Sequence, residues 1–307
     1  MGYHRSLEEL QLNKSWLTIG SFDGVHRGHQ EILKHLTSDE NKQQRPVVVL
    51  TFFPHPAIVL GRRQEPFYIN TPEERAELLF DYGADYVITQ TFDLEIAKIT
   101  AITFVESLQR YLGFEKLVVG PDFALGNKRE GDIQFLRTLG NEVGYSVDVV
   151  SPYQLGGLTV SSSYIRNLIR DGSIEEAAFF LGRSFFLKGT VVSGDARGRS
   201  IGFPTANLST WDERAVPKPG VYACIVRLGD TKSKAVTNIG YRPTFNNKPE
   251  NPLVETHLLD FKGDIYGDEI QIDFIQRLRD EIRFPGIDYL ISQIEDDISR
   301  ARQIFAT

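Results

Sequence analysis

Two histidines three residues apart, His26 and His29, lie in a glycine-rich stretch and could bind phosphate together. The stretch follows an apolar run at 16–19 that predicts a buried strand, and precedes apolar residues at helical spacing in 30–36. At such a junction free backbone N–H groups and the helix dipole favour an anion. Both imidazoles would share one face of the first helical turn, where they could donate to phosphate oxygens and stabilise charge that develops during transfer. Gly20, Gly24 and Gly28 would let the backbone come close to such a ligand, because they have no Cβ. The alternative is a glycine-rich turn with two surface histidines.

Two more loops at the ends of predicted strands carry side chains that could line a ligand slot. The segment 51–56 reads Thr-Phe-Phe-Pro-His-Pro, so two prolines stiffen a loop that contains His55. The loop 120–126 follows a strand that ends at Val119, and its Asp122 could orient a nucleotide or a second substrate. The alternatives are a proline-stiffened core turn for the first loop and a turn cap for the second.

A run of hydroxyl side chains opens a predicted helix near residue 161. The hydroxyls of Ser161 to Ser163, with the free N–H groups of the helix start, could hold a phosphate. Arg166 could add a bidentate contact. Plain helix capping beside a solvated arginine is the alternative.

The second half of the chain has a glycine-rich segment, 189–207, that ends in two neutral oxygen donors. Thr205 and Asn207 alternate along an extended segment, so they would point the same way and could bind one Mg²⁺ beside nucleotide phosphates. Further on, Glu255 could accept a proton from a hydroxyl nucleophile if it faces a cavity. The alternatives are a turn with an Asx motif and a solvated strand glutamate.

The elements that must position these residues fall into two groups. Residues 1 to about 180 alternate short apolar strands with helices, the pattern of a parallel sheet covered on both faces, whose ligands bind at the carboxyl ends of the strands. The helix expected at 71–80 has Thr71 as N-cap and Glu74 at the capping-box position. Beyond 183, period-two strands between Gly- and Pro-containing turns predict a small antiparallel β-barrel, on which a helix at 289–305 packs. We therefore expect two domains, 1–182 and 183–307.

Composition narrows the class of protein. The chain has 307 residues, 41% of them hydrophobic and 24% charged, as in ordinary globular proteins. A net charge of −7 argues against general affinity for nucleic acid or for an anionic membrane. The one cysteine, Cys224, excludes an internal disulfide and a cysteine-based metal site, which favours a cytoplasmic location. No apolar run approaches a membrane span, and the oligomeric state does not follow from the sequence.

Together these motifs resemble the bifunctional bacterial riboflavin kinase/FMN adenylyltransferase family, also called FAD synthetases. The segment 20–29 is similar to that family's form of the HxGH nucleotidylyltransferase signature, 51–56 to its TFxPHP loop, and 160–166 to its ISSTxIR motif. The segment 198–208 resembles the kinase signature with its metal-binding PTxN, and 238–245 continues the kinase pattern. The resemblance covers nearly the whole chain.

The resemblance implies a Rossmann-like adenylyltransferase domain, a barrel-shaped kinase domain and two reactions. ATP would phosphorylate riboflavin to FMN and then adenylylate FMN to FAD with release of pyrophosphate, with Mg²⁺ as the metal. Catalytic roles would fall to Glu255, as base of the kinase, and to His26 and His29; Thr205 and Asn207 would hold the metal. Nucleotide-binding positions would be Gly20, Phe22, Asp23, Gly24, Gly28, Ser161, Ser162, Ser163, Arg166, Gly189, Gly194, Arg199, Gly202 and Tyr266. Flavin-binding positions would be Phe52, Pro54, His55, Asp122, Phe123, Arg279 and Phe284.

The chain departs from the family pattern at two places. Ala124 and Leu125 stand where the family has Arg-Phe or Thr-Phe, so an aromatic is lost beside the flavin or adenine. Ser163 and Tyr164 replace Thr and Arg, which keeps a hydroxyl but removes one possible phosphate contact. Two other classes stay open: a different nucleotidylyltransferase, and a flavin-binding protein without turnover. The β-rich second domain counts against the first class. Retention of the histidine pair and of Thr205, Asn207 and Glu255 counts against the second.

Overall fold

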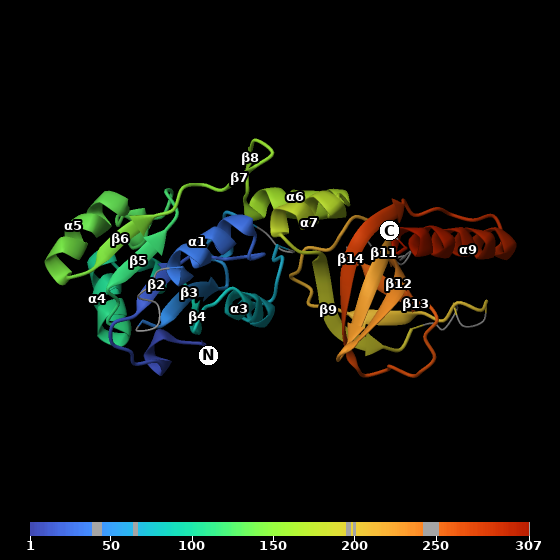
Figure 1. Cartoon of the computed structure of the whole chain (residues 1–307), viewed down its shortest axis with the longest axis horizontal. Helices are drawn as coiled ribbons and strands as arrows, with labels where there is room; N and C mark the ends of the chain where they lie inside the picture. The colour runs from blue at the N-terminus through green and yellow to red at the C-terminus, as the bar shows by residue number, and fades with distance from the viewer. Residues whose placement is uncertain (39–44, 64–66, 195–197, 199–200, 242–251, 307) are drawn as a thin grey trace. The chain divides into compact units, whose positions relative to one another are not determined.

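The structure is a computed structural model that describes residues 1–306 except 39–44, 64–66, 195–197, 199–200 and 242–251. The chain divides into two compact units, Met1–Ser162 and Ser163–Thr307 (Figure 1). This division groups two helices, α6 (Ser162–Asp171) and α7 (Ile174–Leu181), with the second unit. The domain boundary expected at 182/183 stays a prediction.

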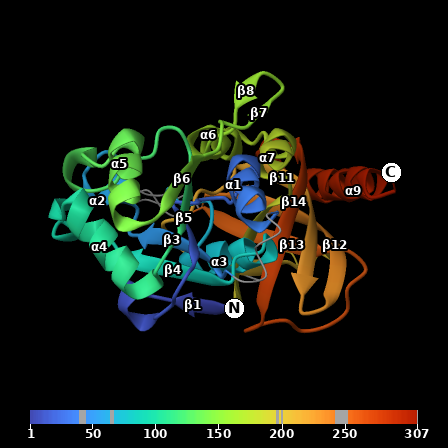
Figure 2. The same cartoon turned by 60° about the vertical axis from the view of Figure 1, so that its left-hand side comes forward.

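The first unit is built on a six-stranded sheet in which all neighbouring strands pair in parallel. This confirms the expected α/β class. The strands lie in the order β1 (Gly2–His4), β4 (Tyr86–Thr91), β3 (Val47–Phe53), β2 (Trp16–Ile19), β5 (Lys116–Val119) and β6 (Ser146–Val149). The three-residue edge strand β1 was not expected from the sequence; Figure 2 shows it beside β4.

Helices cover both faces of this sheet, which explains why its central strands β2 and β3 carry apolar residues on both faces. Val48 and Leu50 of β3 pack in one cluster with α4 (Ala101–Leu112) and α5 (Ile133–Val143). Val49 points the other way, into a cluster with α1 (Arg27–Thr37) and α3 (Pro72–Asp81). Figure 1 shows the strands between these two layers of helices.

Local sequence signals set the ends of these helices. The capping box expected at α3 is present: the Thr71 hydroxyl accepts from the Glu74 amide at 3.2 Å, and the Glu74 carboxylate accepts from the Thr71 amide at 3.1 Å. Shorter elements connect the main ones: η1 (Leu7–Glu9), α2 (Pro56–Val59), η3 (Ile96–Lys98), η4 (Asn127–Arg129), β7 (Gln154–Leu155) and β8 (Leu158–Thr159).

The strand order places a crevice at one edge of the sheet. From β2 the chain adds β3 and β4 on one side and then β5 and β6 on the other. The order therefore reverses between β2 and β5, and ligands bind at the carboxyl ends of strands beside such a switch. The loops after β2 and β5 are those that begin at Gly20 and Gly120.

The second unit contains a closed antiparallel barrel, as expected from the sequence. Its described strands lie in the order β10 (Ala206–Ser209), β13 (Leu253–Leu258), β12 (Thr231–Gly240), β11 (Gly220–Leu228), β14 (Glu269–Arg279) and β9 (Phe185–Val192). The terminal helix α9 (Ile287–Ile304) packs against β11, β12 and β14, and α7 packs against β9 and β14. Within the described part of the chain, no helix is both long enough and apolar enough to cross a membrane.

Candidate functional site

A cavity of about 470 Å³ lies in the first unit where the crevice is expected. Ile19, Gly20 and Ser21, at the end of β2, form one part of its wall, and 122–129 after β5 form another. The expected flavin positions Phe52, His55, Asp122 and Phe123 all line it, whereas Pro54 does not. Residues from the three motifs at the ends of β2, β3 and β5 therefore meet at one cavity.

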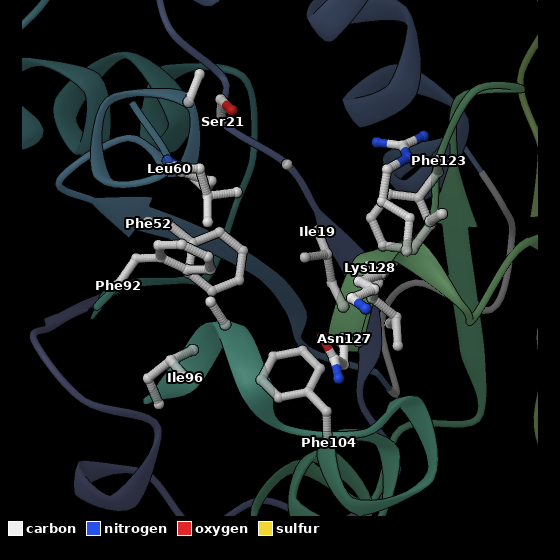
Figure 3. A pocket seen from close by; sticks show the side chains of 18 of the residues that line it. Ile19, Ser21, Phe52, Leu60, Phe92, Ile96, Phe104, Phe123, Asn127 and Lys128 are labelled. Atoms are coloured by element: carbon white, nitrogen blue, oxygen red, sulfur yellow. The ribbon is translucent and has the colours of Figure 1, made fainter. Parts of the chain in front are cut away.

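Four phenylalanines, Phe52, Phe92, Phe104 and Phe123, lie in the cavity wall among aliphatic side chains (Figure 3). Phe52 meets Phe92 edge-on, with ring centroids 5.6 Å apart, and Phe104 of α4 lies 6.4 Å from Phe52. Figure 3 shows Phe123 across Ile19 from these rings. Such a slot suits a flat aromatic ligand. The departures Ala124 and Leu125 also line the cavity, so the lost aromatic would have stood in its wall.

Cationic and imidazole groups lie at the same cavity. Arg62, Lys128 and Arg129 are lining residues, and the Arg129 guanidinium donates to the Asp122 carbonyl at 2.5 Å. The Nδ1 atom of His55 caps α2 by accepting from the Ala57 amide at 3.0 Å. In the neutral ring the proton therefore sits on Nε2. These groups can meet the phosphate of a ligand whose rings occupy the aromatic slot.

The two histidines lie at the start of α1, which begins three residues earlier than the apolar spacing predicted. His26 is the N-cap residue, and its Nδ1 accepts from the His29 amide at 3.4 Å. The two rings are stacked, with centroids 3.7 Å apart and planes 14° from parallel, and the His29 ring also meets Phe22 at 4.9 Å. Neither histidine lines the aromatic cavity. The pair is thus a separate group at a helix N-terminus, next in sequence to the loop that borders the cavity.

The loop before α1 is held in a strained conformation. Phe22 and Val25 have φ values of 47° and 38°, in the left-handed region that β-branched Val25 rarely adopts. Gly24, at φ 83°, occupies a conformation suited to glycine. At Gly28 a Cβ would lie 3.2 Å from the His26 ring, so glycine permits the close approach of that imidazole.

Buried polar contacts fix this loop to the neighbouring elements. The Asp23 carboxylate, fully buried, accepts from the amides of Ile69 and Asn70, the first at 3.0 Å. The carbonyl of Ser21 accepts from the Arg75 guanidinium at 2.9 Å and from the Thr51 hydroxyl at 3.0 Å. Asp23, assigned to nucleotide binding from the sequence, is therefore part of the scaffold of the loop.

Arg75 was missed in the sequence because it stands in a charged stretch of α3 that reads as solvated. It is fully buried, and its second nitrogen lies 3.5 Å from the Phe52 carbonyl. Burial lowers the pKa of the Arg75 guanidinium, and the nearby Asp23 charge opposes that effect. Arg75 thus joins the ends of β2 and β3, where the first two motifs lie.

The serine-rich motif is divided between the two units. Ser162 is the last residue of the first unit, and its hydroxyl donates to the Asp23 carbonyl of the same unit at 2.8 Å. Ser163 and Arg166 belong to the second unit, where the Arg166 guanidinium donates to the Ser163 hydroxyl at 3.3 Å. The Tyr164 hydroxyl donates to Glu176 at 2.8 Å. The phosphate roles of Ser161, Ser163 and Arg166 stay predictions.

The barrel has its own cavity, of about 430 Å³. Thr205, Asn207 and Glu255 line it together with the flavin candidates Arg279 and Phe284. Its apolar wall comes from the barrel and from the helix α9, through Val221, Val236, Leu290, Ile294 and Ile298. The sequence identified the apolar side of α9 but not that part of it faces a cavity.

Asn207 and Glu255 are opposite each other on β10 and β13. Asn207 is 4% exposed, and its Oδ1 has no hydrogen-bond partner among the described residues. A buried amide oxygen left without a partner costs about 1–3 kcal/mol, a cost that a bound cation would remove. A side chain at Gly194 would collide with the Asn207 amide, so that glycine keeps the position open. These residues fit a divalent cation.

Arg279 connects the end of β14 to α9. Its Nε and Nη2 donate to the carboxylate of Asp297, at 3.0 and 2.7 Å, and Asp297 is only 2% exposed. Its Nη1 donates to the Asp280 carbonyl, and the guanidinium carbon lies 5.9 Å from the Phe284 ring centroid. Arg279 therefore holds the helical wall of the cavity in place, whatever it contributes to a flavin.

The remaining nucleotide candidates of this unit lie away from the lining. Gly189, Gly194, Gly202 and Tyr266 do not line the barrel cavity. A side chain at Gly189 would collide with the Ser209 carbonyl, and Gly202 has φ 92°, so both have structural reasons to be glycine. Arg199 lies outside the described residues. Their nucleotide roles stay predictions.

Comparisons with known proteins match the two halves separately. A family model described as FAD synthetase matches residues 8–164, and one described as riboflavin kinase matches 181–305. The bifunctional riboflavin kinase/FMN adenylyltransferase of Escherichia coli K12 is 38% identical over 291 residues, 94% of this chain and 92% of that protein. The protein of the same name from Bacillus subtilis 168 is 36% identical, over 99% and 96% of the two chains. A crystal structure described as a macrolide-efflux protein from Streptococcus pneumoniae aligns with a TM-score of 0.88 and 30% identity over 98% of each chain.

Proposed function

The chain belongs to the bifunctional riboflavin kinase/FMN adenylyltransferase family, and on that premise we propose which residues carry each reaction. The enzyme phosphorylates riboflavin with ATP to give FMN, and adenylylates FMN to give FAD and pyrophosphate. The observation that carries the residue assignment is that each unit has its own cavity: the loops after β2, β3 and β5 line the first, and Thr205, Asn207 and Glu255 line the second.

The barrel cavity is assigned to the kinase. Glu255 takes the proton of the riboflavin 5′-hydroxyl while its oxygen attacks the γ-phosphorus of ATP, and ADP leaves. The apolar wall on α9 receives the flavin ring, because three aliphatic side chains there face the cavity. Thr205 and Asn207 hold Mg²⁺, which would neutralise charge on the ATP phosphates. The buried Asn207 oxygen supports this assignment.

The first unit is assigned to the adenylyltransferase. The phenylalanine-lined cavity binds the FMN ring. The positively charged side chains of Arg62, Lys128 and Arg129 contact its phosphate. That phosphate is already anionic at neutral pH, so it attacks the α-phosphorus of ATP without a general base. His26 and His29, at the helix start beside this loop, donate to phosphate oxygens as pyrophosphate leaves. Positioning and charge neutralisation carry the step.

The test is chromatography of flavin products from riboflavin, ATP and Mg²⁺. FMN should appear first and FAD later, and a chelator should stop the formation of both. A nucleotidylyltransferase of another specificity would make no FMN, and a flavin-binding protein without turnover would make neither product. We also propose that the enzyme works in the cytoplasm, since its one cysteine is a buried free thiol.

A further inference from the structure

His257 lies on β13, the strand that carries the proposed base Glu255. It is close to the segment with the proposed ligands Thr205 and Asn207, which we call the metal loop. It lines the same cavity as Thr205, Asn207 and Glu255. It stands two residues after Glu255 on β13, so the two side chains leave the strand on the same side. Phe203, two residues before Thr205, meets the His257 imidazole edge-on, with ring centroids 5.8 Å apart.

The imidazole makes a hydrogen bond whose direction is fixed by chemistry. The Nδ1 atom of His257 lies 2.7 Å from the carbonyl oxygen of Pro204. A carbonyl oxygen can only accept, so Nδ1 carries the proton and donates it. The residue that receives this bond immediately precedes Thr205, the first of the two proposed metal ligands.

Pro204 lies between two backbone contacts: the Phe203 amide donates to the Gly198 carbonyl at 2.8 Å, and the ladder with β13 follows on the other side. The pairing of β10 with β13 begins at Ala206 opposite Thr256 and runs on through Asn207 opposite Glu255. Pro204 lies two residues outside Ala206 and has no N–H, so it can donate no ladder hydrogen bond there. The Pro204 carbonyl instead accepts a hydrogen bond from the His257 side chain. The segment that carries Thr205 is thereby anchored on one side by His257 and on the other by the ladder at Ala206.

We propose that His257 is a positioning residue of the kinase, which sets the geometry of the Thr205–Asn207 metal loop by donating from Nδ1 to the Pro204 carbonyl. This inference rests on the proposed kinase assignment. His257 takes no part in proton transfer in this proposal, since Glu255 is the base. Residues that orient metal ligands typically change metal affinity by about 10–100-fold when they are removed.

The experiment compares three substitutions at one position. His257→Asn places an amide N–H near the position of Nδ1, His257→Gln places it near that of Nε2, and His257→Ala removes it. Binding of Mn²⁺ in the presence of ADP is measured by electron paramagnetic resonance, and kinase rate is measured across a Mg²⁺ series. Riboflavin binding, followed by fluorescence, checks that the barrel of each variant is folded, and FAD formation from supplied FMN should be unchanged because the first unit carries that reaction.

Ala and Gln should weaken Mn²⁺ binding and raise the half-saturating Mg²⁺ concentration roughly 10–100-fold, and Asn should restore most of both. Riboflavin binding, followed by fluorescence, should change little in all three. Unchanged Mn²⁺ binding by His257→Ala, or an Asn variant no better than the Gln variant, would overturn the proposal. If the unsubstituted chain makes no FMN, the kinase assignment itself fails, and that result is seen before any variant is compared.

Discussion

Asn207 and Glu255 face each other directly across the β10–β13 ladder. Side chains of directly opposed residues leave an antiparallel pair on the same face, with Cβ atoms about 4.5–5.5 Å apart. The proposed metal ligand and the proposed base are therefore held by backbone hydrogen bonds of the barrel and not by a loop alone. Such a scaffold fixes the distance between the two groups before any substrate binds.

Replacing Glu255 with Gln should depress kinase turnover about 10²–10⁴-fold, because the amide keeps the shape of the side chain but cannot take a proton. Binding of riboflavin and ATP should change little. FAD formation from supplied FMN should be unaffected, since that reaction belongs to the other unit. The measurement is the single-turnover kinase rate, with riboflavin binding followed by fluorescence. Near-normal phosphorylation by Glu255→Gln would show that Glu255 is an ordinary strand glutamate and not the base.

Asn207→Ala should behave differently, because it removes a metal ligand and not a base. Its kinase rate should recover in part as Mg²⁺ is raised, whereas that of Glu255→Gln should not. Asn207→Asp is the matched variant: it keeps an oxygen at the same place and should need less Mg²⁺ than the alanine variant. A defect in Asn207→Ala that no Mg²⁺ concentration changes would rule out the ligand role.

Much of the fold could be predicted from local signals. The bounds of α4, Ala101–Leu112, follow from its regular apolar spacing and from Thr100 and Gly113 at its ends. The parallel sheet was predictable because runs such as 47–53 are apolar on both faces, a pattern that only a doubly covered sheet requires. The capping box at Thr71 predicted the start of α3 for the same local reason.

What the sequence did not predict depends on contacts between distant segments. The buried guanidinium of Arg75 donates to the carbonyls of Ser21 and Phe52, which lie 54 and 23 residues earlier in the chain. The sequence of α3 alone gives no sign of these contacts. The hydrogen bond from His257 to Pro204 spans 53 positions and follows from barrel register, which turn signals do not specify. The aromatic slot likewise needs Phe92 and Phe104 from different elements, and each of these reads as a core residue by itself.

His29→Ala should lower FAD formation by about a hundredfold, because a donor aimed at developing charge is lost. Riboflavin phosphorylation should remain nearly intact, so FMN should accumulate as the end product. His35→Ala is the matched control: it removes the same side chain from the last turn of the same helix, where His35 is half exposed and pairs with Asp148. Equal loss of both activities in His29→Ala, or an equal loss of FAD formation in the control, would contradict the assignment of the histidine pair.

The last prediction concerns where the kinase can be separated from the rest of the chain. The sequence placed the boundary at 182/183, whereas the structure groups α6 and α7 with the barrel. Four side chains of α7 are buried: Ile174, Ala177, Phe180 and Leu181. A fragment of residues 163–307 retains them, and it should fold and make FMN but no FAD.

A fragment of residues 183–307 keeps every kinase motif but lacks α7. The lost burial of Ile174 and Phe180 alone should cost roughly 3–6 kcal/mol, at about 1.5–3 kcal/mol for each large apolar side chain. That is a large part of the 5–15 kcal/mol that stabilises a typical domain. The shorter fragment should therefore unfold at a clearly lower urea concentration, or aggregate, and make less FMN per mole of protein. Urea unfolding and FMN formation by both fragments provide the comparison. If the shorter fragment is as stable and as active as the longer one, α7 is not part of the kinase fold and the boundary at 182/183 is correct.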